Sequence, residues 1–216
     1  MSLRTEKAEK IRKGLYCITA QNLSKGRDNI TVVREMLMGG AKIIQYREKY
    51  REIKARYEEC LEIKRLCQEY GAIFIINDNI DIALLVKPDG VHIGQDDLPI
   101  DMVRKLVGED MLIGLSTHSP QQAQRAVEMG ADYIGVGPIY PTKTKDNVCE
   151  AVGLEYLSYV AENINIPYVA IGGIKEHNME QVVQAGGKCL CMVSDITGAD
   201  NISEKVRKII NILDKQ

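Results

Sequence analysis

Residues 42–78, KIIQYREKYREIKARYEECLEIKRLCQEYGAIFIIND, contain the unit from which the fold is built. A short apolar run at 42–47 is followed by a long segment at 51–70 and by a second apolar run at 73–77. In the long segment, helical spacing relates Ile53, Tyr57, Leu61, Lys64 and Cys67, while Glu and Lys fill the other faces. A strand, a helix and a second strand in this order predict a right-handed crossover in a parallel sheet.

The same alternation continues along the 216 residues of the chain. Short apolar, β-branched runs lie at 15–19, 42–47, 73–77, 90–93, 112–116, 133–136, 168–171 and 189–193. Several are almost continuously apolar, as strands of a parallel sheet are when both faces are covered. Eight strand–helix units predict the α/β class and a single, compact (β/α)8 TIM barrel with short loops, because such barrels usually have ~250 residues. An open doubly wound sheet is the alternative, but no switch point is evident.

The composition agrees with one globular domain over residues 1–216, in which 1–14 form a helical or extended lead-in. The net charge of −2, from 28 basic and 30 acidic residues, argues against a nucleic-acid partner bound through a general phosphate field. No run approaches the ~20 apolar residues of a membrane span, and the charged N-terminus lacks the apolar stretch of a signal peptide. We expect a cytoplasmic protein with no membrane partner. Its oligomeric state stays open, a homo-oligomer included.

The six cysteines have no spacing typical of a zinc site. Cys189 and Cys191 are predicted to share one face of a strand, and Cys60 and Cys67 one face of a helix. With Cys17 and Cys149, they are interpreted as buried free thiols of a reducing compartment.

Polar residues follow seven of the eight predicted strands at the same end. These segments are 45–49 (QYREK), 77–78 (ND), 94–97 (GQDD), 116–119 (STHS), 137–145 (GPIYPTKTK), 172–174 (GGI) and 193–194 (VS). In a TIM barrel the carboxyl ends of the strands carry the active site. The sequence therefore predicts that these segments meet at one mouth.

The segment at 45–49 indicates an anion site. Alternation along the strand puts Gln45, Arg47 and Lys49 on one side, with Tyr46 and Glu48 on the other. Two cations beside apolar walls need an anion, and phosphate is the natural partner. The alternative is a surface run of ion pairs with Glu48 and Glu52.

Asp78 and Asp97 follow strands that are neighbours in the predicted barrel. Two close carboxylates repel unless a cation lies between them, and Mg²⁺ commonly joins carboxylates to substrate phosphates. The alternatives are that each residue caps the helix that follows it, and that Asp96 replaces Asp97 as the ligand.

Gly172 and Gly173 precede a helix predicted to begin near His177, and such a loop exposes backbone N–H groups to a phosphate. The loops after strands seven and eight form the usual phosphate site of this fold, and Ser194 lies on the second of them. Two anion sites at one mouth favour a transferase with two phosphorylated substrates. An isomerase would need only one.

These segments resemble the thiamine phosphate synthase family from Leu15 to Asp195. The matching strings are 45–49 (QYREK), 77–78 (ND), 90–97 (GVHIGQDD), 116–118 (STH), 135–145 (GVGPIYPTKTK), 171–174 (IGGI) and 193–194 (VS). The resemblance implies a Mg²⁺-dependent TIM barrel that joins hydroxymethylpyrimidine diphosphate to thiazole phosphate and releases diphosphate. It also implies a dissociative mechanism, in which diphosphate leaves before the thiazole nitrogen attacks the pyrimidine carbocation.

The resemblance further implies the site residues. The pyrimidine diphosphate would be bound by Gln45, Tyr46, Arg47, Glu48, Lys49, Asn77, Ser116 and Lys145, of which Arg47, Lys49, Ser116 and Lys145 would be catalytic. The thiazole phosphate would be bound by Thr142, Lys143, Thr144, Gly173, Val193 and Ser194, and Mg²⁺ by Asp78 and Asp97. Two departures are notable. Tyr46 replaces an aliphatic residue and is expected to face away from the pocket, and Asp195 begins an unusual continuation after Ser194.

Two alternative functions remain. A thiazole tautomerase of the same superfamily would use His118 as acid and base, but it would leave Arg47, Lys49, Asp78, Asp97 and Lys145 without a task. The ordinary role of His118 is a hydrogen bond on its loop. A non-catalytic barrel that senses phosphorylated metabolites is the third possibility, and it would bind without magnesium.

Overall fold

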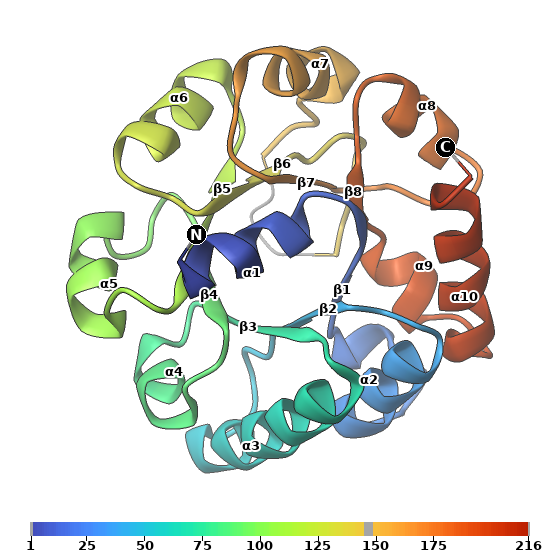
Figure 1. Ribbon diagram of the computed structural model, residues 1–216. Coiled ribbons are helices and arrows are strands. Elements are labelled where there is room, and N and C mark those ends of the chain that lie inside the picture. Colours follow the sequence, from blue (N-terminus) through green and yellow to red (C-terminus); the bar gives the residue numbers. More distant parts are fainter. Residues whose placement is uncertain (1, 145–148, 216) are drawn as a thin grey trace.

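The computed structural model describes residues 2–144 and 149–215, and its eight parallel strands form one closed barrel in chain order (Figure 1). The predicted TIM barrel is therefore confirmed. The strands are β1 (Gly14–Ile18), β2 (Ile43–Tyr46), β3 (Ile73–Asn77), β4 (Gly90–Ile93), β5 (Leu112–Thr117), β6 (Tyr133–Val136), β7 (Tyr168–Ile171) and β8 (Cys189–Cys191).

Helices surround the barrel and pack on its outer face (Figure 1). They are α2 (Asn29–Met38), α3 (Ile53–Tyr70), α4 (Ile80–Val86), α5 (Ile100–Val107), α6 (Pro120–Glu128), α7 (Gly153–Asn163), α8 (Met179–Gln184), α9 (Val193–Thr197) and α10 (Ile202–Leu213), with a 3₁₀ turn at Gln21–Leu23. None of the helices in the described ranges combines the length and the hydropathy that a membrane span needs.

The alternation of side chains along each strand divides the core into two layers. Outward residues such as Ile44 and Ile76 pack against the helices, whereas inward residues such as Tyr16, Ile43 and Ile75 fill the barrel. The interior is therefore a packed core, and the space for ligands is at its carboxyl end.

Helix α3 buries a different face from the one predicted. Its exposed side chains include Ile53 and Leu61, which are 53% and 43% accessible. The buried residues are Glu59, Cys60, Ile63, Leu66 and Cys67. These buried residues also have helical spacing and form a stripe beside the predicted one. Within this stripe, the Glu59 carboxylate accepts a hydrogen bond from the hydroxyl of the barrel residue Tyr46 at 2.6 Å.

The cysteine prediction holds for five of the six residues. Cys17, Cys60, Cys67, Cys189 and Cys191 are buried free thiols, but Cys149 is exposed. Burial raises the pKa of the Cys17, Cys60 and Cys67 thiols to about 12, so these groups stay protonated at neutral pH. Cys149 is the exception because it lies on the long loop after β6, outside the packed layers.

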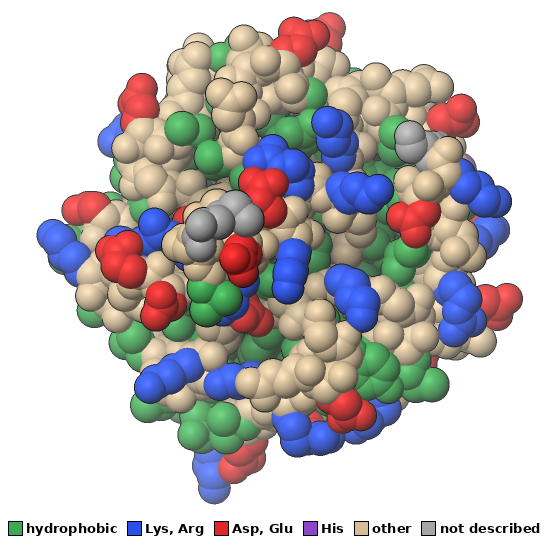
Figure 2. Space-filling view, viewed as in Figure 1, with side chains coloured by type: hydrophobic (Ala, Val, Ile, Leu, Met, Phe, Trp, Pro, Cys, Tyr) green, Lys and Arg blue, Asp and Glu red, His purple; other side chains and the backbone are tan. Residues whose placement is uncertain are grey.

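The lead-in forms helix α1 (Leu3–Ile11), which lies across the amino-terminal end of the barrel (Figure 1). Ala8 and Ile11 are buried in the inner layer of the core. Lys7 pairs with Asp89 at 2.8 Å. In the space-filling view of this end, basic and acidic side chains are interspersed around the helix (Figure 2). The helix thus closes the end opposite the mouth.

We expect Ile11→Ala to lower the free energy of unfolding by about 2–4 kcal/mol, because a fully buried aliphatic side chain leaves a cavity when truncated. Leu3→Ala is the matched control on the same helix, since Leu3 is 57% accessible. Urea denaturation measures both. Equal stabilities of the two variants would show that α1 does not seal the barrel.

Candidate active site at the barrel mouth

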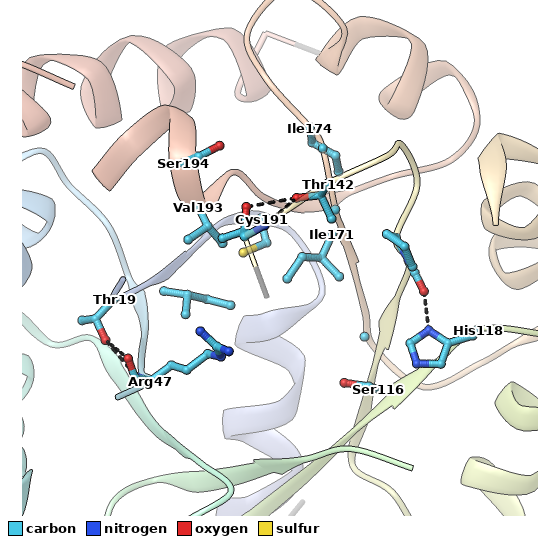
Figure 3. Close-up of a pocket in the computed structure, with 17 residues that line it drawn as sticks. Thr19, Arg47, Ser116, His118, Thr142, Ile171, Ile174, Cys191, Val193 and Ser194 are labelled. Carbon is cyan, nitrogen blue, oxygen red and sulfur yellow. Dashed lines mark hydrogen bonds between the residues drawn. The ribbon is translucent and has the colours of Figure 1, made fainter. Parts of the chain in front are cut away.

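A hollow with an empty volume of about 820 Å³, called the main hollow below, opens at the carboxyl ends of the strands. Figure 3 shows that side chains from opposite sides of the barrel converge on it. Its lining includes the predicted residues Arg47, Ser116, Thr142, Thr144, Gly173, Val193 and Ser194, and also Thr19, His118 and Cys191. Residues from distant parts of the chain therefore share one cavity.

Arg47 is fixed at the mouth by the loop after β1. Its backbone N–H donates to the Thr19 hydroxyl at 2.8 Å, and that hydroxyl donates to the Arg47 carbonyl oxygen at 3.1 Å. Thr19 is fully buried, so this pair of hydrogen bonds is shielded from water. The Arg47 side chain extends into the hollow (Figure 3). Gln45, two residues earlier, is buried in the barrel interior below it.

A second hollow of about 500 Å³ adjoins the first at the end of β2. Arg47 lines both hollows, and Glu48, Lys49, Lys143 and Thr144 line the second. The backbone N–H of Lys49 donates to Glu48 Oε1 at 2.8 Å, which turns the chain there. This rim is rich in cations, as an anion site requires. Lys145, predicted to join it, lies outside the described residues.

Tyr46 does not reach the mouth. Its side chain points outward from the barrel, is buried, and donates from its hydroxyl to Glu59 on α3. Burial, followed by the Glu59 hydrogen bond, raises the pKa of Tyr46 far above its usual range. The structure therefore separates Tyr46 from the other members of the predicted pyrimidine diphosphate set.

We expect Tyr46→Phe to leave the Michaelis constant for the diphosphate substrate unchanged and to lower stability by about 1–3 kcal/mol, because the buried Glu59 carboxylate loses a donor. Asn29 and Arg51 still contact that carboxylate. Steady-state kinetics and urea denaturation measure the two effects. A large rise in that Michaelis constant would place Tyr46 in the binding site after all.

Asp78 and Asp97 follow β3 and β4 as predicted, but neither caps a helix. Asn79 and Pro99 occupy the cap positions of α4 and α5 without a side-chain capping bond. Asp78 has a left-handed backbone with φ of 59°, and its N–H donates to the carbonyl of His92 at 2.9 Å. Asp97 Oδ2 accepts from the Gly94 N–H at 2.6 Å.

The chemistry of this pair suits a hard cation. Within residues 2–144 and 149–215, no three His, Cys, Asp or Glu side chains are grouped as a closed metal site. Asp78 and Asp97 supply carboxylate oxygens on adjacent loops, however, and Mg²⁺ usually takes one or two carboxylates and completes its shell with water and substrate phosphate. The donor set therefore fits Mg²⁺, with Asp97 beside a neighbouring hollow and not in the main one.

The opposite side of the main hollow is built from backbone. Gly173 has φ of 65°, and an added Cβ would lie 2.7 Å from Tyr140 Cβ and 2.8 Å from the Pro141 carbonyl. Only glycine fits this close approach of two loops. The hydroxyls of Thr142 and Thr144, from the loop after β6, are 3.0 Å apart beside it.

The helix whose amino end borders the hollow is α9. The predicted strand at 189–193 ends at Cys191, and α9 begins at Val193. The helix predicted near His177 is α8, which starts at Met179. Asp195 in the first turn of α9 accepts from the Glu176 N–H at 3.1 Å and pairs with Lys205 at 3.0 Å. Asp195, which departs from the family pattern, therefore connects α9 to the segment before α8 and to α10.

His118 has the structural role given above as its ordinary one, a hydrogen bond made from its loop. Its Nδ1 donates to the carbonyl oxygen of Gly137, on the loop after β6 (Figure 3). The ring thus holds the two loops together and lines the hollow from its edge.

Sequence reasoning missed three polar side chains inside the barrel, Tyr16, Tyr133 and His92, which connect the predicted site residues Gln45 and Ser116. A hydrogen-bonded chain joins Gln45, Tyr16, Tyr133, His92 and Ser116, which lie on five different strands. Strand alternation was the available signal, because it places all five side chains on inward positions. Their pairing could not be read from spacing, since it depends on the closure of the barrel.

A TIM barrel with cations, hydroxyls and backbone N–H groups around one mouth is typical of enzymes that act on phosphorylated small molecules. Residues 15–196 match the family model of thiamine monophosphate synthase. The thiamine-phosphate synthase of Pelotomaculum thermopropionicum is 57% identical over 202 residues, which cover 94% of this chain and 93% of the relative. That of Lawsonia intracellularis is 55% identical over 195 residues, or 90% of each chain.

The fold comparison agrees. The solved structure of thiamine phosphate pyrophosphorylase from Pyrococcus furiosus has a TM-score of 0.84 and 34% identity, and the match covers 98% of this chain and 99% of that one. The chain belongs to the thiamine monophosphate synthase family. The predicted family, and with it a transferase of thiamine biosynthesis, is confirmed. The family reaction couples a pyrimidine diphosphate to a thiazole phosphate.

Proposed function

We propose that this chain binds hydroxymethylpyrimidine diphosphate and thiazole phosphate together at the mouth and joins them with Mg²⁺ as cofactor. The observation that carries the proposal is the lining of the main hollow. Its lining combines Arg47 and Ser116, from β2 and β5, with Gly173, Val193 and Ser194, from the segments after β7 and β8. Two anionic groups of different substrates can therefore occupy opposite sides of one cavity.

The pyrimidine diphosphate is assigned to the side formed by β2, β3 and β5. Gln45, Arg47, Asn77 and Ser116 surround a hollow that reaches into the barrel, which suits a flat heterocycle, and Glu48 and Lys49 follow on the rim. Arg47 and Lys49 then face the diphosphate, with Lys145 as a further cation. Charge-assisted hydrogen bonds of this kind fix an anion more strongly than neutral ones.

The thiazole phosphate is assigned to the side formed by the loops after β6, β7 and β8. Thr142 and Thr144 offer hydroxyls, and the backbones of Gly173, Val193 and Ser194 offer N–H donors next to the start of α9. Lys143 lines the neighbouring hollow and adds a positive charge at the rim. This arrangement matches the common phosphate site of TIM barrels.

Asp78 and Asp97 are the proposed Mg²⁺ ligands. When bound, the ion neutralises negative charge on the departing diphosphate. Arg47, Lys49 and Lys145 stabilise the same charge from fixed positions, and such preorganised stabilisation favours cleavage of the carbon–oxygen bond before attack. The thiazole side holds the second substrate so that its ring nitrogen can form the new carbon–nitrogen bond. No side chain of the mouth needs to act as a nucleophile.

Turnover with purified components tests the proposal. Both substrates, enzyme and Mg²⁺ are expected to give thiamine phosphate and diphosphate in equal amounts, and omission of either substrate or addition of a chelator is expected to stop the formation of product. Absence of thiamine phosphate from the complete mixture would contradict the proposed function. Binding of the pyrimidine diphosphate without metal and without turnover would instead favour a sensor.

A further inference from the structure

The barrel floor contains a continuous hydrogen-bonded chain between two residues of the proposed pyrimidine site. Gln45 Nε2 donates to the Tyr16 hydroxyl at 2.9 Å, and the Tyr16 and Tyr133 hydroxyls are 2.9 Å apart. The Tyr133 hydroxyl is 3.1 Å from His92 Nδ1, and His92 Nε2 is 3.0 Å from Ser116 Oγ. The chain thus crosses the barrel from β2 to β5 through β1, β6 and β4.

The rings of this chain fit because two neighbouring strands carry glycine. A Cβ on Gly114 would lie 2.2 Å from Tyr133 Cζ and 2.6 Å from His92 Nδ1. A Cβ on Gly135 would lie 3.4 Å from His92 Cε1. The two glycines therefore make room for both rings, which also line the hollow that reaches into the barrel.

Burial keeps the phenols protonated. Tyr16 and Tyr133 are only 2% and 0% accessible. Burial raises the pKa of both hydroxyls well above the usual range. Each phenol therefore has one hydrogen to donate and one oxygen that accepts.

The amide of Gln45 sets the direction of the whole chain, because its N–H can only donate. Tyr16 accepts from it and has to pass its own hydrogen to Tyr133. Tyr133 then has to donate to His92 Nδ1, which leaves the proton of the neutral ring on Nε2. If Nδ1 held the proton, the Tyr133 hydrogen would turn back to Tyr16, and the hydrogen of Tyr16 would then lose its acceptor in the chain.

The geometry points to His92 as a positioning residue that orients the Ser116 hydroxyl. His92 Nε2–H donates to Ser116 Oγ, so the Ser116 hydrogen turns away from His92 and is available as a donor to the mouth. The group that binds at Ser116 is then a hydrogen-bond acceptor of the pyrimidine diphosphate. This assignment rests on the proposed function, whereas the direction of the chain follows from the hydrogen bonds alone.

The tautomer of His92 tests the direction of the chain without any substrate. The protein has 3 histidines, so long-range ¹H–¹⁵N spectra are simple, and the spectrum of His92→Gln identifies the His92 signals. We expect the neutral ring with its proton on Nε2 in the wild type, and loss of this single tautomer in Tyr133→Phe. A wild-type ring with its proton on Nδ1 would overturn the inference, whatever reaction the enzyme catalyses.

Kinetics of matched variants test the effect on Ser116. His92→Gln keeps an acceptor and a donor on one side chain, whereas His92→Leu fills the space with neither. We expect His92→Leu and Tyr133→Phe to lower kcat/KM for the pyrimidine diphosphate about tenfold or more, with the Michaelis constant for the thiazole phosphate unchanged. His92→Gln is expected to recover most of the loss.

Tyr156→Phe is the control. Its hydroxyl is also buried and donates to Thr117 Oγ1 at 2.7 Å, but on the outer side of the barrel. We expect a loss of stability and wild-type kinetics. Two results would show that His92 only fills space: the same kinetics in His92→Leu and His92→Gln, or a loss of kcat/KM in Tyr156→Phe as large as that in His92→Leu. A wild-type enzyme that makes no thiamine phosphate would contradict the proposed function, and the tautomer would still decide the direction of the chain.

Discussion

Asp78→Asn and Asp97→Asn are each expected to lower turnover by about a thousandfold or more, because a metal ion supplies several kcal/mol of charge stabilisation to the departing diphosphate. Asparagine is the suitable replacement at both positions. It tolerates the left-handed backbone of Asp78, and its amide oxygen can still accept the hydrogen bond that Asp97 receives from Gly94. The variants therefore remove charge while the loops keep their shape.

Asp81→Asn is the matched control, since Asp81 is an exposed carboxylate in the first turn of α4, close in sequence to Asp78. It is expected to keep wild-type turnover. Asp96→Asn decides between the two carboxylates after β4, because a large loss there with full activity in Asp97→Asn would make Asp96 the ligand. If both Asp78→Asn and Asp97→Asn kept wild-type rates in magnesium buffer, the metal would not bind at this edge of the barrel.

Arg47→Met is expected to lower kcat/KM for the pyrimidine diphosphate by about ten- to a hundredfold, since a hydrogen bond to a charged group contributes about 1.5–3 kcal/mol. Methionine keeps an apolar stem of similar shape but carries no charge. The pair of hydrogen bonds with Thr19 involves only the backbone of Arg47, so it remains in the variant. Initial rates at varied concentrations of each substrate separate the two binding sites.

Lys54→Met is the control for the loss of one positive charge. Its side chain is 85% accessible and pairs only loosely with Glu58, at 3.9 Å. Wild-type kinetics are expected of it. If Arg47→Met affected both substrates equally, or neither, Arg47 would not belong to the diphosphate side of the mouth.

The barrel could be predicted because its signals are local. Each strand is a short apolar run, each crossover has its own helical period, and the closed parallel order follows from repetition of this unit. The polar segments after the strands could be placed at one mouth for the same reason. Gly173, Ser194 and Arg47, which are far apart in sequence, do line one hollow.

Features that depend on packing between elements could not be predicted. Helix α3 buries the stripe that contains Glu59, whose partner Tyr46 lies on another element, and Ile53 is exposed although it fits a helical stripe. The short helix α9 replaces the end of a predicted strand, and its residue Asp195 contacts Glu176 and Lys205 from other elements.

We expect the mouth to hold a diphosphate on the Arg47 side and a monophosphate on the Ser194 side. A crystal structure with thiamine phosphate, diphosphate and Mg²⁺ tests it most directly. We predict density for the diphosphate beside Arg47 and Lys49, and for the ester phosphate against the N–H groups of Gly173 and Ser194. Both phosphorylated groups on the same side of the mouth, or either one bound elsewhere on the barrel, would show that the mouth does not hold two separate anion sites.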